Sequence, residues 1–339
     1  MQNLPSNSSP QPGHVLDVRD LKMHFPGPRK GMLPWQGRAS IKAVDGVNLQ
    51  VPYGKTLGLV GESGSGKSTL GRAVLQLHKP TAGQVLFEDR DLCQLSRKDM
   101  RTIRRRAQII FQDSYASLDP RRSIGYTIGE PLLLSGTTDA RARRDRVHEL
   151  LRLVGLNPAY ENRYPHEFSG GQRQRVNIAR ALATDPIFIV ADEPVSALDV
   201  SIQAQVINLM RGLQERLNLS YLFISHDLRV VRYISDQVAV MYLGRVVETA
   251  PTEVIFRDPQ HPYTKALLQS VPKPRWETVG EERKTLKGEI PSPINPPRGC
   301  AFASRCPFVM DRCRESRPPL VEIAPEHQAA CFLLTDEVN

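Results

Sequence analysis

Residues 61–69 (GESGSGKST) constrain the fold of this chain more than any other stretch. Their spacing, G-x-x-x-x-G-K-S, is that of a phosphate-binding P-loop, and they lie between an apolar run at 56–60 and a helical pattern from 67 to about 78. Glycines permit the tight turn in which backbone N–H groups face phosphate oxygens, and the following helix presents its positive N-terminus to the same anion. We therefore predict a strand–loop–helix unit that binds a nucleotide, in preference to a purely structural turn.

Alternating strand and helix patterns predict an α/β fold with a mostly parallel core sheet. Residues 15–25 and 41–51 alternate apolar and polar side chains as half-buried strands do, and 26–40 is typical of a loop insertion. Residues 124–156 have mostly helical periodicity. Further helices are expected at 173–182, 201–217 and 263–270, and further strands at 84–87, 107–111, 187–191, 220–224 and 237–242.

Two acids follow the apolar run at 187–191, at the strand end where ligands of open α/β sheets collect. Asp192 is placed to hold Mg²⁺ together with the Ser68 hydroxyl, while Lys67 supplies a positive charge for the β- and γ-phosphates. The adjacent Glu193 is suited to orient or deprotonate a water molecule. Two acids alone might cap a helix; with a P-loop upstream, hydrolysis of a nucleoside triphosphate is the favoured interpretation.

Composition limits the environment and the partners. Residues 1–13 are rich in Ser, Pro, Asn and Gln and lack the apolar centre of a signal peptide, and no stretch approaches the about 18–20 apolar residues of a membrane span. We therefore expect an unstructured tail and a cytoplasmic protein. The net charge of +9 permits nucleic-acid or lipid contact, but the arginine clusters at 101–106 and 141–146 fit solvated helix faces, and aromatic residues are sparse.

Residues 168–175 (FSGGQRQR) resemble the signature motif of ABC-transporter ATPases, and they lie between the P-loop and Asp192 as they do in that family. In the same order, Gln112 resembles the family's Q-loop, residues 196–199 (SALD) its D-loop, and His226 its switch histidine. The resemblance covers about residues 15–270. It implies a P-loop NTPase of the ABC ATPase type in a domain at 14–270, with an antiparallel β subdomain and a helical signature subdomain at about 113–182.

The resemblance also implies a role for each matched residue, with ATP and Mg²⁺ as the bound species. Glu193 would be the general base, assisted by Gln112 and by His226, which would contact the γ-phosphate and position the attacking water. Ser68, Gln112 and Asp192 would surround Mg²⁺. The residues expected around ATP are Phe25, Gly61, Glu62, Ser63, Gly64, Ser65, Gly66, Lys67, Ser68, Thr69, Gln112, Ser169, Gly170, Gly171, Gln172, Asp192 and Asp199.

Three of these expectations concern particular parts of the nucleotide site. Phe25 would stack on adenine, in preference to a plain core position. The signature residues 169–172 would face the P-loop of a partner subunit, so that ATP is sandwiched head to tail between two subunits. Asp199 would communicate across that interface.

Further phrases resemble the ATP-binding subunits of bacterial dipeptide and oligopeptide importers, notably 163–168 (RYPHEF), 192–205, 241–244 (MYLG), 261–264 (HPYT), 288–293 and 295–300. The likeness is to the second ATPase of the pair. It implies a peripheral protein on the cytoplasmic face of the inner (plasma) membrane. The implied partners are a second, non-identical ABC ATPase, two transmembrane permease subunits that contact Gln112 and residues 124–156, and a periplasmic or extracellular peptide-binding protein.

Alternative functions differ in cargo or in class. A near-identical motor would serve import of nickel, glutathione or small oligosaccharides. A soluble ABC ATPase acting on ribosomes or DNA is disfavoured, because the chain has one cassette and no long coiled-coil insertion; we expect no nucleic-acid partner. Residues 114–115 (SY) depart from the family, whose members usually carry proline there, so the shape of that loop is not predicted.

The C-terminal region, 271–339, concentrates four of the five cysteines in a segment of little periodicity: Cys300, Cys306, Cys313 and Cys331. In a cytosolic protein such a group favours metal over disulfides, and four sulfur ligands suit zinc or an iron–sulfur cluster. The missing C-x₂-C pair weakens the zinc-ribbon interpretation, and the importer resemblance implies a [4Fe–4S] cluster. Zinc and reduced structural thiols are the alternatives; Cys93 is expected to be a small apolar residue.

Overall fold

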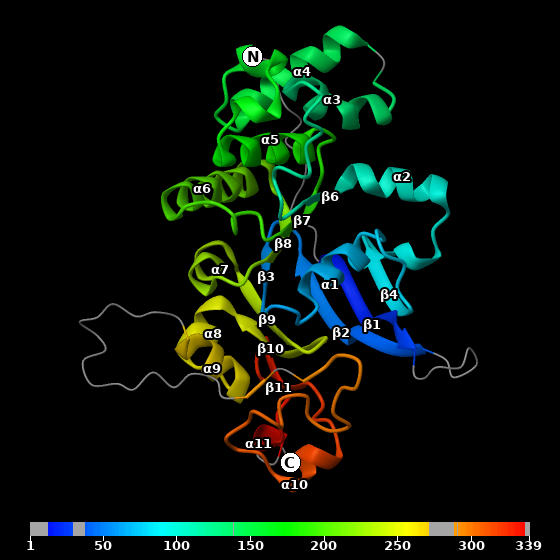
Figure 1. Cartoon of the computed structure of the whole chain (residues 1–339), viewed down its shortest axis with the longest axis vertical. Helices are drawn as coiled ribbons and strands as arrows, with labels where there is room; N and C mark the ends of the chain where they lie inside the picture. Colours follow the sequence, from blue (N-terminus) through cyan, green and yellow to red (C-terminus); the bar gives the residue numbers. More distant parts are fainter. Residues whose placement is uncertain (1–12, 30–37, 138, 271–287, 290, 336–339) are drawn as a thin grey trace, which may run out of the picture.

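The computed structural model describes residues 13–29, 38–137, 139–270, 288–289 and 291–335, in two sheets with helices around them (Figure 1). The smaller sheet has the order β2-β1-β4-β5. Its antiparallel strands are β1 (His14–Arg29), β2 (Arg38–Pro52), β4 (Ala82–Phe87) and β5 (Arg90–Asp91). The antiparallel β subdomain implied by the sequence is thereby confirmed.

The larger sheet has the order β11-β12-β10-β9-β3-β8-β7-β6. At its centre β9 (Gln237–Tyr242), β3 (Thr56–Val60), β8 (Ser220–Ile224), β7 (Phe188–Asp192) and β6 (Ala107–Ile110) are parallel. Every residue of β3, β7 and β8 is buried, which explains why these strands are apolar runs without polar alternation. The predicted parallel core sheet is confirmed.

The other three strands of this sheet were not predicted. The strand β10 (Arg245–Pro251) pairs antiparallel with β9 on one side and with β12 (His327–Ala329) on the other, and β11 (Val321–Ala324) adds to β12. The expectation of an irregular C-terminal region is therefore wrong in part, because residues 321–329 extend the core sheet. Glu248 holds the junction: its buried carboxylate accepts hydrogen bonds from the backbone of Gln260 and His261 and pairs with His327 at 2.8 Å.

Helices lie along both sheets and at the two ends of the molecule (Figure 1). At one end α3, α4 and α5 pack together, and at the other end α10 and α11 lie within the C-terminal extension (Figure 1). The helices are α1 (Lys67–Val74), α2 (Arg97–Arg106), α3 (Ile124–Leu134), α4 (Ala140–Leu153), α5 (Gly170–Leu182), α6 (Val200–Leu217), α7 (Leu228–Ile234), α8 (Thr252–Arg257), α9 (Pro262–Gln269), α10 (Asp311–Glu315) and α11 (Phe332–Thr335), with 3₁₀ turns η2 (Leu92–Gln94), η3 (Pro158–Asn162) and η4 (Pro165–Glu167).

Two predicted boundaries need correction. The hairpin of β1 and β2 continues through residues 26–29 and 38–40, with Pro26 opposite Ser40, so only 30–37 of the expected loop insertion remain, and these lie outside the described residues. Proline is accepted there because β4 pairs with β1 only between residues 16 and 22, which leaves the far end an edge. The helix α1 stops at Val74, before the left-handed Gln76 (φ 54°). The expected tail, 1–13, lies outside the described residues except for Gly13.

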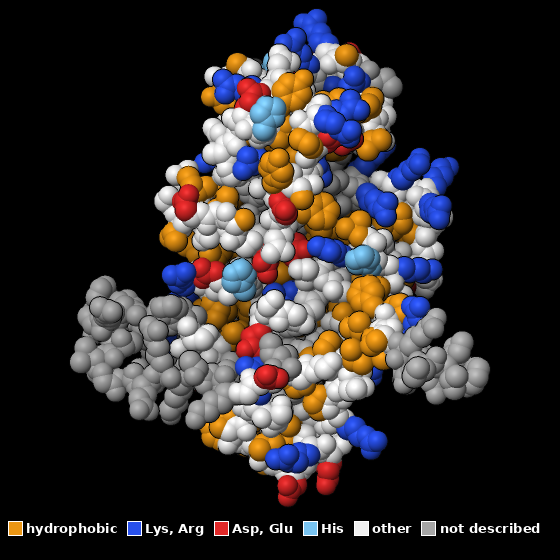
Figure 2. Space-filling model, viewed as in Figure 1, with side chains coloured by type: hydrophobic (Ala, Val, Ile, Leu, Met, Phe, Trp, Pro, Cys, Tyr) orange, Lys and Arg blue, Asp and Glu red, His pale blue; other side chains and the backbone are white. Residues whose placement is uncertain are grey.

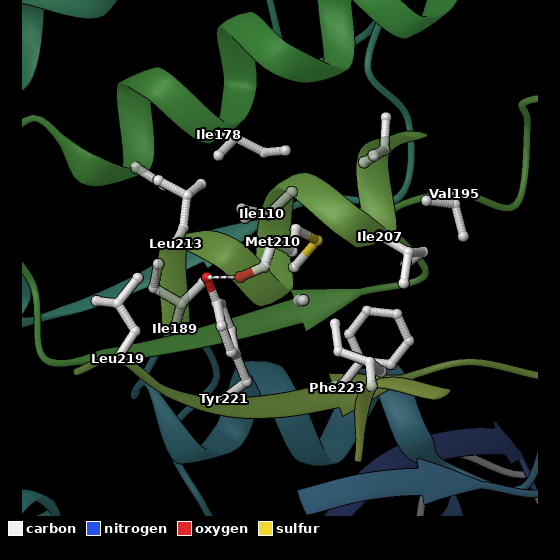
Figure 3. Packing of buried hydrophobic residues seen from close by; sticks show 14 of the residues in the cluster. Ile110, Ile178, Ile189, Val195, Ile207, Met210, Leu213, Leu219, Tyr221 and Phe223 are labelled. Carbon is white, nitrogen blue, oxygen red and sulfur yellow. Dashed lines mark hydrogen bonds between the residues drawn. The ribbon is translucent and has the colours of Figure 1, made fainter. Parts of the chain in front are cut away.

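A buried cluster of apolar side chains joins the central sheet to α5 and α6. Figure 3 shows Ile189, Tyr221 and Phe223 of the sheet packed beneath Ile178, Met210 and Leu213 of these helices. The Tyr221 hydroxyl donates to the Met210 carbonyl at 3.4 Å, which satisfies a fully buried polar group. This packing fixes the positions of β6, β7 and β8 relative to α5 and α6.

The basic clusters lie on the surface. Figure 2 shows Lys and Arg side chains gathered over α2 and over the end of the molecule formed by α3 and α4. In α2 only Met100 and Ile103 turn inward, so the arginines face solvent as the sequence predicts. Among the helices that the structure describes, none is long and apolar enough to cross a membrane.

Candidate functional site

The loop between β3 and α1 closes around the Lys67 side chain. Its ammonium donates to the carbonyl oxygens of Gly61 at 2.9 Å and Glu62 at 3.0 Å. Gly66 has φ 102° immediately before α1, and a Cβ atom there would overlap the carbonyl oxygen of Ala43. No side chain caps the start of α1, so the amides of its first turn remain available to an anion.

Ser68 and Asp192 meet although 124 residues separate them. The Ser68 hydroxyl donates to Asp192 Oδ1 at 2.7 Å, whereas Oδ2 is buried without a hydrogen-bond partner and lies 3.7 Å from the Arg72 guanidinium. Burial raises the pKa of the Asp192 carboxyl, and the Ser68 hydrogen bond opposes that rise. A hydroxyl beside a buried carboxylate with one unused oxygen is a donor set that fits Mg²⁺.

Gln112 and His226 converge on one oxygen of Glu193. Gln112 Nε2 donates to Glu193 Oε2 at 2.9 Å, and His226 Nδ1 lies 3.3 Å from the same oxygen. The three residues follow β6, β7 and β8, which are neighbours in the sheet. Glu193 itself has φ 47° and is held by a backbone hydrogen bond to Ile224, so its side chain projects from a fixed, left-handed position.

The signature motif forms the start of α5 rather than a loop before it. Ser169 and Gln172 make reciprocal hydrogen bonds of 3.3 and 3.0 Å as a capping box, so the helix begins at Gly170 and not at the predicted 173. A Cβ atom on Gly171 would overlap Ile202 of α6, whose first turn is capped by Asp199 at 3.0 Å. Signature and D-loop are therefore packed together within one chain.

The start of α5 and the start of α1 belong to different parts of the molecule. The helix α5 packs against α3, α4, α6 and β6, whereas α1 packs against β1, β2, β7 and β8 (Figure 1). Phe25 is half-buried on β1, with its ring edge-to-face against His78 at a centroid distance of 5.8 Å, and it packs against the core cluster that includes Leu70 of α1.

The cysteines of the C-terminal region share one small, largely apolar pocket, which Cys300, Cys306, Cys313 and Cys331 line together with Phe302 and Phe308. All four are free thiols, and burial raises the pKa of Cys300 to about 11. In the part of the chain that the structure describes, no group of three or more His, Cys, Asp or Glu side chains is arranged to hold a metal ion. Cys93 packs against a second cluster of buried apolar side chains, which includes Val15, Leu70 and Phe87.

Sequence reasoning missed two contacts to the phosphate loop. Arg305 binds the Glu62 carboxylate, and the Tyr263 hydroxyl accepts a hydrogen bond from the Glu62 backbone N–H at 2.9 Å. Tyr263 stands in the phrase HPYT, but no local pattern links it to a loop 201 residues away.

Comparison with known proteins gives consistent matches. Residues 44–196 match the family described as ABC transporter, and residues 247–313 match the family described as oligopeptide/dipeptide transporter, C-terminal region. The chain is 53% identical to the oligopeptide transport ATP-binding protein AppF of Bacillus subtilis, over 94% of this chain and 97% of that protein. It is 49% identical to the dipeptide transport ATP-binding protein DppF of Haemophilus influenzae, over 94% of this chain and 96% of that protein.

Among solved structures, the ATP-binding cassette MJ0796, a dimer in a post-hydrolysis state bound to ADP and Pi, superposes with a TM-score of 0.60 at 29% identity. The match covers 70% of this chain and 98% of that one. Another match, cbiO1 from Clostridium perfringens, which is part of the ABC transporter complex cbiONQ, has a TM-score of 0.61 at 26% identity, over 73% and 92% of the two chains.

Proposed function

Because this chain belongs to the ATP-binding proteins of the ABC transporter family, we propose that its ATP hydrolysis powers the import of dipeptides or oligopeptides through a membrane complex. The observation that carries the hydrolytic part is the convergence of Gln112 and His226 on Glu193, beside the pair formed by Ser68 and Asp192. The peptide cargo is supported by the match at 247–313 and by the names of the relatives.

The contacts within the loop suggest how ATP is accepted. Lys67 exchanges the carbonyl oxygens of Gly61 and Glu62 for phosphate oxygens, to which the free amides at the start of α1 also donate. Ser68, Gln112 and Asp192 are the residues to hold Mg²⁺, which neutralises charge on the β- and γ-phosphates. Glu193 takes the proton of the attacking water, and His226 positions that water.

A partner subunit completes the site in this proposal. The residues Ser169, Gly170, Gly171 and Gln172 face the residues 61–69 of the partner, and Phe25 stacks on the adenine. The separate positions of α5 and α1 within one chain support this arrangement, since one nucleotide would not reach both. The packing of Gly171 on Ile202 supports a path from the signature to Asp199 at the subunit interface.

The helical end of the molecule offers a docking surface for the transmembrane permease subunits. A groove of about 240 Å³ between α3, α4 and η3 is lined by apolar and charged side chains that include Tyr126, Leu133, Arg143, Val147 and Glu161. Leu133, which lines the groove, and the neighbouring Leu134 are both exposed. We assign this groove, with Gln112, to the permease contact at the cytoplasmic face of the membrane.

Affinity isolation from solubilised membranes tests the complex. The tagged full chain should recover a second, non-identical ABC ATPase, two permease subunits and an extracytoplasmic peptide-binding protein. Growth of a deletion strain on peptides as sole nitrogen source should fail, whereas uptake of nickel, glutathione or oligosaccharides should be unaffected. Recovery of ribosomes or DNA instead of membrane subunits would contradict the proposal.

For the cysteine pocket we propose a [4Fe–4S] cluster held by Cys300, Cys306, Cys313 and Cys331, with Zn²⁺ as the alternative. The shared pocket and the four free thiols support it, although the thiols are not arranged as a ligand cage in this structure. Anaerobically purified protein should contain about four iron and four sulfide per chain, and Cys313→Ser should remove them. A folded, colourless sample free of metal would leave only reduced structural thiols.

A further inference from the structure

A bidentate ion pair joins the C-terminal extension to the phosphate loop. The Arg305 guanidinium contacts both carboxylate oxygens of Glu62, at 2.7 and 3.0 Å, across 243 residues of sequence. The Arg305 side chain is only 4% exposed and lies 5.9 Å from the centroid of the Tyr242 ring. Two parallel charged hydrogen bonds at a buried arginine fix both the position and the orientation of Glu62.

The backbone of Glu62 is held as firmly as its side chain. Its N–H donates to the Tyr263 hydroxyl at 2.9 Å, while its carbonyl accepts from Lys67 Nζ at 3.0 Å and from the Ser65 N–H at 3.2 Å. Glu62 is therefore the point at which contacts from the C-terminal part of the chain meet the contacts that shape the loop.

Contacts with its own neighbours hold Arg305 in place. Its backbone N–H donates to the Phe302 carbonyl at 3.0 Å, and the Phe302 ring packs 5.4 Å from the rings of both Tyr242 and Tyr263. Phe302 is 1% exposed, so the turn that carries Arg305 is anchored in the aromatic group that also contains Tyr263.

The ion pair between Arg305 and Glu62 also changes the electrostatics of the phosphate loop. Burial lowers the pKa of the Lys67 ammonium, and the negative charges of Glu193, Asp192 and Glu62 oppose that lowering. The Glu62 carboxylate would repel an incoming triphosphate, and Arg305 is the cation that neutralises it.

We propose that Arg305 is a positioning residue for ATP: it fixes Glu62 and neutralises its carboxylate, so that the loop receives phosphate in a preformed shape. This inference rests on the proposed role of residues 61–69 as the triphosphate site. It assigns to the C-terminal extension a direct effect on nucleotide affinity.

Arg305→Gln should raise the Kd for Mg·ATP about 10-fold, which corresponds to about 1.4 kcal/mol, and should raise KM equally with kcat changed less than about twofold. Calorimetric titration of the full chain with ATP measures the Kd, and phosphate release from the assembled transporter separates KM from kcat. Arg305→Lys keeps the positive charge but loses the two parallel hydrogen bonds of the guanidinium. Its Kd should therefore lie between those of the wild type and of Arg305→Gln.

The double variant Glu62→Gln/Arg305→Gln separates charge from general destabilisation. Because it removes the carboxylate that Arg305 neutralises, its Kd should fall below that of Arg305→Gln, and the part of the loss that remains measures the lost positioning. Arg317→Gln is the matched control: Arg317 also ties the extension to the core, through Asp45 at 3.3 Å, but does not touch the loop.

An unchanged Kd in a folded Arg305→Gln protein would overturn the inference, as would an equal loss of affinity in Arg317→Gln. If Arg305→Gln does not fold, Arg305→Lys is used in its place. A Kd of Arg305→Lys equal to that of the wild type would then overturn the inference. Failure of the wild-type chain to bind ATP would instead refute the proposed function.

Discussion

Glu193→Gln is expected to leave ATP binding intact and to slow hydrolysis by about 100-fold or more, the usual contribution of a general base. The substitution keeps the shape of the side chain and an oxygen for Gln112 Nε2, but it removes the negative charge that draws a proton from water. Because bound ATP then persists, the subunit should accumulate with its partner in a closed dimer. Phosphate release, equilibrium ATP binding and size-exclusion chromatography measure the three effects.

Glu253→Gln is the control for this substitution. Glu253 is 78% exposed and pairs only weakly with Arg232 at 3.3 Å, so its loss should change neither turnover nor assembly. Full hydrolysis by Glu193→Gln would remove Glu193 from the role of base and leave the attacking water to another group.

Lys67→Ala should weaken ATP binding by about 100-fold, because each hydrogen bond from a charged donor contributes about 1.5–3 kcal/mol and this ammonium is placed to serve two phosphates. Hydrolysis at ordinary ATP concentrations should fall with it. The variant also leaves the carbonyl oxygens of Gly61 and Glu62 without their cation, so a modest drop in Tm is expected in the absence of nucleotide. Titration with ATP and thermal unfolding measure both changes.

Lys55→Ala removes a comparable cation at the other end of β3. Lys55 is 56% exposed and pairs with Asp236 at 3.0 Å, away from the loop, so ATP affinity should stay within about twofold of the wild type. A folded Lys67→Ala protein with wild-type affinity would show that the loop does not hold the triphosphate through its lysine.

Local pattern predicted the buried strands of the central sheet. The strands β3, β8 and β9 match their predicted ranges, because fully buried strands are short apolar runs bounded by turns. Parallel strands bring their carboxyl ends to one edge, but Gln112 and His226 were assigned by resemblance to the family and not by local pattern. The strand order β8-β7-β6 then brings both side chains to Glu193.

The features that were not predicted, the pairing of β12 with β10 and the ion pair of Arg305, join segments that are far apart in the sequence. The pairing of β12 with β10 joins residues about 80 apart, and three residues of β12 carry too little pattern to reveal it. The pair formed by Arg305 and Glu62 is more extreme, since an arginine between cysteines in a proline-rich segment has no local reason to face a phosphate loop. Such contacts depend on how the completed core places its surfaces.

The distance in sequence between Glu62 and Arg305 has a consequence for the timing of synthesis. At about 5–20 residues per second, a ribosome needs about 12 to 50 s to add the 243 residues that separate them. During that interval the nascent chain acquires Gln112, Glu193 and His226, which we propose for hydrolysis, while Glu62 does not yet have Arg305 beside it. If Arg305 acts as proposed, the phosphate loop of the growing chain would bind nucleotide weakly until Arg305 has been added and has reached Glu62.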